Sequence, residues 1–331
     1  MSGRTGRLAL AACALIAGIA AAPPSGWIAQ LPAGVALPAI PADNPPTAAR
    51  IALGRRLFYD ADLSIDGTMA CATCHEQHRG FADGNPTHPG VHGEPARRNV
   101  PGLANVAWLP SYTWADPRLR TLEAQVRVPV LGDHPVEMGM KGQEAELVAR
   151  LVRDGCYRLM FDAAFPDRHG QIDLQAVAQA LASFERTFVS FDAPYDRARA
   201  GGPELAPLAR RGEALFRRGC AGCHSGPNFT DGRFHRILAP DARDAGLGEI
   251  THDVRDHGRF RTPGLRNAAV TQPYFHDGSV PTLADAIARH PGTRSPADVA
   301  ALTAFLAALT DEKFLRDPRF ALPDKACGRR L

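Results

Sequence analysis

Apolar residues recur at helical spacing just before two similar cysteine-containing segments. The stretches 48–58 and 208–218 each place a phenylalanine four residues after a glycine, the pairs being Gly54 with Phe58 and Gly212 with Phe216. Residues four apart share one face of a helix, so each glycine permits close approach of another helix where the phenylalanine meets the core or a bound group. This weak internal duplication predicts two similar helical domains.

Two other apolar faces predict core helices that carry no chemistry of their own. Asp173 is placed to cap a helix that runs to about Phe188, and residues 299–309 repeat apolar side chains at helical spacing. Strand signals are few. Long irregular loops are expected at 78–101 and 225–265. A Pro/Gly-rich interdomain linker is expected at 192–207.

The first 22 residues are predicted to be an export signal. Arg4 and Arg7 precede an apolar run that ends in small residues before Pro23. The run is short and rich in alanine, so we expect no membrane span after cleavage, and the expected location is the periplasm. Cys13 lies in a sequence that resembles a lipoprotein cleavage box. Too few apolar residues precede Cys13 for that reading, which favours cleavage near Ala22.

Composition adds two constraints. The formal net charge is +3 over 331 residues, so no excess of basic side chains points to nucleic acid or to a membrane surface. The chain has 31 glycines and 28 prolines but only five tyrosines and three tryptophans. Compact helices joined by many irregular loops suit this balance, with a bulky cofactor supplying part of the core.

Two Cys-x-x-Cys-His motifs carry the strongest chemical signal, and their residues are Cys71, Cys74 and His75 in one and Cys220, Cys223 and His224 in the other. In such motifs two thiols add to the haem vinyl groups and the histidine becomes an iron ligand. One motif alone also suits a zinc half-site or a thiol redox centre. Two complete copies after similar helices favour haem. We therefore expect an all-α fold of two cytochrome c-like domains, at 45–200 and 205–331, each binding one covalent c-type haem.

Two further cysteines remain once Cys13 and the motif cysteines are set aside. Cys156 and Cys327 could pair in an oxidising compartment, but sequence supplies no distance between them. The plainer interpretation is two unrelated thiols.

The chain resembles bacterial dihaem cytochrome c peroxidases and, more closely, their MauG-like relatives, with the MbnH-like group nearest. The resemblance covers nearly everything after the export signal. Besides the haem motifs, it rests on the segments 98–101, 134–139, 258–263, 265–267 and 273–279, and the tail segments 309–312 and 317–320 look like the MbnH-like group in particular.

The resemblance implies that hydrogen peroxide reacts at the N-terminal haem. Glu137 matches the family glutamate that moves a proton between the peroxide oxygens, and Gln125 matches the distal glutamine. Pro129 matches a proline that MauG-like members place over the iron. Ordinary dihaem peroxidases also have a loop histidine that blocks this iron. His88 and His92 lie near that position, and of the two His92 is the better candidate, although an open iron is favoured.

The second haem is implied to be a six-coordinate electron relay. At the position where peroxidases have methionine and MauG has tyrosine, this chain has His290. Ligation by His224 and His290 is chemically sensible, because imidazole binds iron well. The alternative is that His290 is only a histidine at a helix end, near the negative pole of the helix dipole.

The region between the haems is implied to contain a tryptophan and a calcium ion. Trp114 matches the family tryptophan that carries charge between the haems, with Trp108 as a local competitor. Asn99, with the backbone oxygens of Thr271 and Pro273, matches the calcium site, because oxygen ligands suit a hard cation. An asparagine that bonds its own turn is the alternative for Asn99.

Two enzymatic readings and one non-enzymatic reading follow. A peroxidase would take electrons from a small periplasmic redox protein, whereas a MauG-like enzyme would oxidise side chains of a partner protein. The tail and the lack of a clear distal histidine favour the second. A dihaem electron-transfer cytochrome with both irons saturated is the non-enzymatic alternative.

Overall fold

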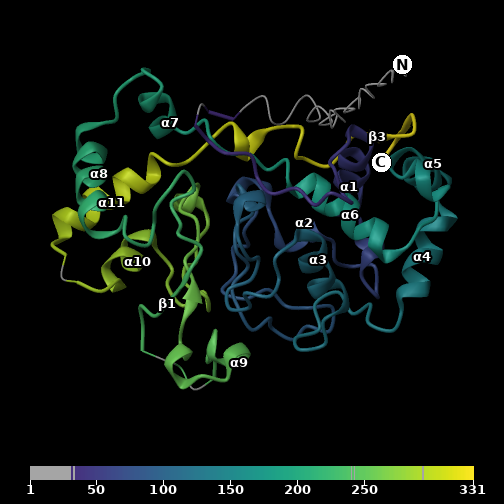
Figure 1. Ribbon diagram of the computed structural model, residues 1–331, viewed down its shortest axis with the longest axis horizontal. Coiled ribbons are helices and arrows are strands. Elements are labelled where there is room, and N and C mark those ends of the chain that lie inside the picture. The colour runs from purple at the N-terminus through teal and green to yellow at the C-terminus, as the bar shows by residue number, and fades with distance from the viewer. Residues whose placement is uncertain (1–30, 33, 240, 242, 293) are drawn as a thin grey trace, which may run out of the picture.

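The computed structural model describes residues 31–331 except 33, 240, 242 and 293, so the predicted export signal and Cys13 lie outside the described residues. Two groups of helices lie side by side, with long loops between them (Figure 1). The first group contains α1 (Ala48–Phe58), α2 (Cys71–Cys74), α3 (Leu122–Leu131), α4 (Glu144–Arg153), α5 (Gly155–Ala164) and α6 (Leu174–Glu185). The second contains α7 (Pro194–Arg199), α8 (Pro207–Gly219), α9 (Gly248–Thr251), α10 (Leu283–Arg289) and α11 (Pro296–Ala307).

The remaining elements are short. Single 3-10 turns lie at Ala61–Leu63, Gln77–Arg79, Val106–Trp108, Pro166–Arg168, Val254–Asp256, Ala268–Val270 and Phe314–Arg316. Antiparallel pairs form between β1 (Phe234–His235) and β2 (Phe260–Arg261), and between β3 (Lys325–Ala326) and β4 (Arg329–Arg330). The prediction of a helical fold with few strands is confirmed. No helix in the described part of the chain is long and apolar enough to cross a membrane.

The internal duplication is confirmed as a repeated helix crossing. A Cβ atom built on Gly54 of α1 would lie 1.9 Å from the Ala180 carbonyl oxygen of α6. A Cβ atom on Gly212 of α8 would likewise lie 1.9 Å from the carbonyl oxygen of Ala301 in α11. Because only glycine fits at these points, each helix that leads into a Cys-x-x-Cys-His motif is fixed against a later helix of its own group.

Helix ends follow the capping expectations. Asp173 accepts a hydrogen bond from the Ala176 amide at the start of α6, as predicted, and the helix ends at Glu185, slightly before the expected Phe188. The predicted linker contains a short helix, α7, which begins with Pro194 at its first turn. Pro194 presets the helical φ angle, so a proline-containing segment that suggested a loop starts a helix instead.

Aromatic rings fill the core of the first group. Phe81 and Phe188 stack with centroids 4.0 Å apart, and Phe58 meets both of them edge to face. Phe314 and Phe320, from the end of the chain, belong to the same buried cluster. In Figure 1 the yellow C-terminal segment crosses from the second group back to the first.

The interpretation of Cys156 and Cys327 as unrelated thiols is wrong. The two form a disulfide that joins α5 to the C-terminal tail, with Cα atoms 5.7 Å apart. Arg55 of α1 donates to the carbonyl oxygens of Pro318 and Ala321, which holds the same tail. The pairing forms because the C-terminal tail packs against the first helical group, and no local pattern in the sequence indicates that contact.

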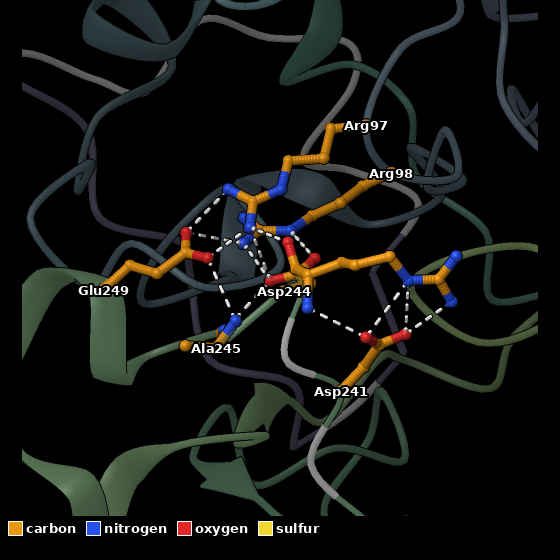
Figure 2. Close-up of polar contacts among 8 residues, drawn as sticks. Arg97, Arg98, Asp241, Asp244, Ala245 and Glu249 are labelled. Atoms are coloured by element: carbon orange, nitrogen blue, oxygen red, sulfur yellow. Dashed lines mark hydrogen bonds and ion pairs between the residues drawn. The ribbon is translucent and has the colours of Figure 1, made fainter.

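A network of ion pairs joins the loops of the two groups (Figure 2). Arg98 donates two hydrogen bonds to Asp244, at 2.8 and 2.7 Å, and a third to Glu249 at 3.3 Å. Arg97 also bonds Glu249 and donates to the backbone oxygen of Arg243 at 2.9 Å. These contacts fix Arg97 and Arg98 against Arg243, Asp244 and the α9 residue Glu249.

Candidate haem and cation sites

The first Cys-x-x-Cys-His motif forms a single helical turn, α2, with His75 directly after it. The His75 Nδ1 atom lies 2.7 Å from the backbone oxygen of Phe81. That contact assigns the proton to Nδ1 and leaves Nε2 free to bind a metal. Burial lowers the pKa of His75, which favours the neutral ring that metal binding requires.

The second motif repeats this arrangement at the end of α8. His224 Nδ1 lies 3.0 Å from the Phe229 backbone oxygen. The phenylalanine of each preceding helix lies with its ring centre 6.5 Å from the motif histidine, Phe58 beside His75 and Phe216 beside His224. The two motifs therefore present their imidazoles in the same way.

His290 lies opposite His224. Its Nδ1 contacts the Ala286 backbone oxygen at 2.7 Å, which leaves Nε2 free, and the two ring centres are 6.2 Å apart. Two metal–nitrogen bonds of about 2 Å, with about 1.1 Å from each nitrogen to its ring centre, span about 6 Å. The pair thus fits one iron between two imidazoles. Burial lowers the pKa of both rings, that of His224 to about 4.

Glu137 lies in a segment that is fixed from two sides. The Met138 amide donates to the Pro129 backbone oxygen at the end of α3, and the Val91 amide donates to the Glu137 backbone oxygen. Burial raises the pKa of Glu137, and the nearby His88 opposes the rise. A carboxyl group with a raised pKa is suited to exchange protons near neutral pH. Gln125 is partly buried on α3.

Of the two loop histidines, the sequence favoured His92 as the one near the first haem site, but the structure places His88 there. His92 is exposed, whereas His88 is largely buried and its Nδ1 contacts the Asp83 carboxylate at 2.6 Å. The loop is pressed against the Glu137 segment, because a Cβ atom on Gly90 would lie 1.8 Å from the Val136 oxygen. His88, rather than His92, therefore lies beside Glu137.

A cavity between the two helical groups brings four predicted residues together. Its lining includes Asn99, Trp114, Thr271 and Pro273. The Trp114 Nε1 donates to the Asn99 backbone oxygen at 2.7 Å. Trp108 is not part of this lining, and its Nε1 donates to Ala36 instead.

The donor set of the cavity fits a hard cation. The Asn99 side-chain amide donates to the backbone oxygens of Asn85 and Pro86, at 3.2 and 3.1 Å. Asn99 therefore bonds a distant loop and is not an asparagine that bonds the backbone of its own turn. Among the described residues no hydrogen bond reaches Asn99 Oδ1 or the backbone oxygens of Thr271 and Pro273. Oxygen acceptors of this kind, from three residues that line one cavity, are the ligands that calcium prefers.

Sequence reasoning missed several charged groups near these sites. Asp83 holds His88, and Asp231 contacts His235 at 2.7 Å beside Cys223. Arg261 lies almost wholly buried in the cavity lining. The sequence signal for these residues is weak, because they lie in loops and two-residue strands where spacing along the chain does not indicate which side chains meet.

The structure is that of a helical protein in which two groups of helices each carry a Cys-x-x-Cys-His motif with a histidine whose pKa is lowered by burial. The family model described as "Di-haem cytochrome c peroxidase" matches residues 48–204. The methylamine utilization protein MauG of Methylophilus methylotrophus is 38% identical over 272 residues, which cover 77% of this chain and 78% of MauG. The cytochrome c551 peroxidase of Pseudomonas aeruginosa is 32% identical over 82% of this chain and 80% of its own length.

A solved MauG-like protein associated with microbial copper homeostasis superposes with a TM-score of 0.85 and 36% identity, covering 89% of this chain and 98% of that chain. The chain belongs to the di-haem cytochrome c peroxidase and MauG family. It is accordingly a peroxidase-type oxidoreductase, as the resemblance predicted.

Proposed function

We propose that this protein is a periplasmic oxidoreductase that uses hydrogen peroxide at its N-terminal haem and passes electrons through its C-terminal haem. The observation that carries the proposal is the asymmetry of the two histidine sites. His224 faces a second imidazole, that of His290, at the span of one iron. On the N-terminal side, the buried carboxyl group of Glu137 interacts electrostatically with Cys74, and among the described residues no ring contact joins His75 to a second histidine. His88 interacts electrostatically with both His75 and Glu137, but its Nδ1 is held by Asp83.

The residues that hold the haems are the two sets of motif cysteines and histidines, with His290 as the second ligand of the C-terminal iron. When bound, the haems supply one iron that reacts with peroxide and one that stores and transfers electrons. Glu137 takes a proton from one peroxide oxygen and returns it to the other, which then leaves as water. Burial raises its pKa, which supports this role because a carboxyl group that binds its proton more tightly is better able to take one up from peroxide and deliver it again.

Trp114 and the cavity around it connect the two sites. The indole lies in the lining shared by both helical groups, and its Nε1 is tied to Asn99. A calcium ion held by Asn99, Thr271 and Pro273 would fix the two groups at this point, because its ligands come from both sides. Gln125 completes the proposed N-terminal site as a polar neighbour of bound peroxide.

Oxidation of a partner protein is the version that we favour over reduction of peroxide by a small redox protein. The similarity to MauG and to a MauG-like structure supports it. Trp114 is the last tryptophan in the sequence, so a route to a partner would use other residues. Tyr274 is one candidate, since it lines the cavity and donates to the Ala268 oxygen at 2.8 Å.

Electron paramagnetic resonance of the haem-loaded ferric protein tests the proposal. We expect one high-spin and one low-spin haem, and His290→Ala should remove the low-spin bis-imidazole signal. Glu137→Gln should keep both signals and slow the reaction with peroxide by about 10²-fold or more, the usual scale of general acid–base catalysis. Two low-spin signals in the native protein would favour an electron-transfer cytochrome, and an unchanged peroxide rate in Glu137→Gln would remove Glu137 from the mechanism.

A further inference from the structure

Three arginines are buried among the described residues, and only one of them lacks a carboxylate partner. Arg186 contacts Glu123 at 2.8 Å, and Arg266 makes two hydrogen bonds to Asp196, at 2.7 and 2.8 Å. Arg261 is 3% exposed, and no ion pair involving it is found in the described ranges.

The contacts that Arg261 does make are to neutral groups. Its Nε donates to the Thr113 backbone oxygen at 3.0 Å, and one Nη donates to the Thr262 oxygen at 3.5 Å. The ionisable group that interacts electrostatically with Arg261 is Tyr112, and burial raises the pKa of Tyr112 to about 12, so its phenol is neutral at pH 7. A guanidinium that is buried without an anion loses its hydration with no charge to compensate it, which implies that an anion binds there.

The position of Arg261 identifies the source of that anion. Arg261 lines the cavity between the helical groups, and the segment continues to Pro263, whose backbone faces the His224 ring. Thr230 donates to the Thr262 oxygen at 2.6 Å, which ties the same segment to the loop after the second haem motif. A haem carries two propionate carboxylates, and a planar guanidinium binds a carboxylate through paired hydrogen bonds.

We propose that Arg261 binds a propionate of the C-terminal haem. The inference rests on the proposed function only in placing a haem at the second motif. The Arg261 amide also donates to the Trp114 backbone oxygen at 2.8 Å. Arg261 therefore acts as a positioning residue that joins the C-terminal haem to the segment carrying Trp114.

Reduction potentials of the haem-loaded variants test the charge of Arg261. Arg261→Gln removes a positive charge that favours the reduced iron, so the potential of the low-spin haem should fall. We expect at least a tenfold change in its reduced-to-oxidised ratio at a fixed potential, which is about 59 mV for one electron. Arg261→Lys keeps the charge and should change this ratio less than threefold. An unchanged potential in Arg261→Gln, or a change confined to the high-spin haem, would overturn the assignment.

Resonance Raman spectra supply a second readout that does not depend on folding of the neutral variant. Lysine cannot form the paired hydrogen bonds of arginine, so Arg261→Lys should shift the propionate bending band. Arg266→Lys is the matched control, because Arg266 is buried in the same cavity lining but bonds Asp196. That variant should leave the band in place. Equal bands in Arg261→Lys and the native protein would contradict propionate binding.

Haem content separates the failure of this inference from the failure of the proposed function. A pyridine haemochrome assay that finds no haem at the second motif would remove both. If the protein binds two haems but does not react with peroxide, the proposed function is wrong. The Arg261 assignment is then decided by the potential and Raman measurements alone.

Discussion

Glu185 lies at the end of α6 with 6% of its surface exposed, and in the part of the chain that the structure describes no hydrogen bond reaches its carboxyl group. Burial raises its pKa from 4.5 to about 8, opposed by the charge of Arg186. The folded state therefore keeps a proton that the unfolded state has already released. This contribution to stability is complete below pH 4.5 and is lost as the pH rises through about 8.

Glu185→Gln should remove this pH dependence. We expect the variant to be more stable than the native protein by about 2–4 kcal/mol at pH 8 and nearly equal to it near pH 4.5. Urea unfolding of the haem-loaded protein at the two pH values measures the difference. Glu312→Gln is the control, because that carboxylate is exposed and should leave stability unchanged at both. The same gain at both pH values would show that Glu185 does not titrate as described.

At the scale of elements, the position of each haem motif depends on a helix crossing at a glycine, Gly54 where α1 meets α6 and Gly212 where α8 meets α11. Gly212→Ala would place a Cβ atom against the Ala301 carbonyl of α11, so we expect a loss of about 3 kcal/mol or more and displacement of the motif that follows α8. Gly219, at the end of the same helix, has open space around its Cβ position. Gly219→Ala should therefore be neutral or slightly stabilising. Thermal unfolding compares the two, and equal melting temperatures would contradict the crossing.

These crossings also explain what the sequence could predict. Helices α1, α6, α8 and α11 were expected because their apolar residues recur at helical spacing around a capping or small residue. Helices α4 and α5 were missed, although Leu147 and Leu151 are buried four residues apart and offered a usable signal. The motif histidines were found because their chemistry is local. The environments of His88 and Arg261 could not be predicted, because they depend on loops from distant parts of the chain.

At the scale of the whole molecule, the ion pairs of Figure 2 fix the two helical groups relative to each other. Asp244 is buried, which raises its pKa, but the hydrogen bonds and charge of Arg98 more than offset this and hold the pKa below its usual value. Asp244 therefore contributes stability above its ordinary titration range, and the contribution is lost as the pH falls.

Asp244→Asn should weaken the junction between the groups. Loss of the buried pair should destabilise the haem-loaded protein by about 3 kcal/mol, because Arg98 loses its two shorter charged hydrogen bonds and keeps only the 3.3 Å contact to Glu249. The variant should also become more sensitive to proteolysis at residues 243–247. Asp241→Asn serves as the comparison, because its bonds to Arg243 are exposed and join residues two apart. If both variants behave alike in calorimetry and proteolysis, the pairs do not hold the groups together.

The return of the C-terminal tail has a consequence for the order in which the protein is made. A chain is synthesised from its N-terminus, and domains generally fold as they appear. The first helical group lacks part of its packing at that stage, because Phe314, Phe320 and the Cys327 end of the disulfide belong to it. Its core stays incomplete until the second group has been made. We therefore expect haem to be attached at Cys71 and Cys74 while that domain is still open, with the tail closing over it last.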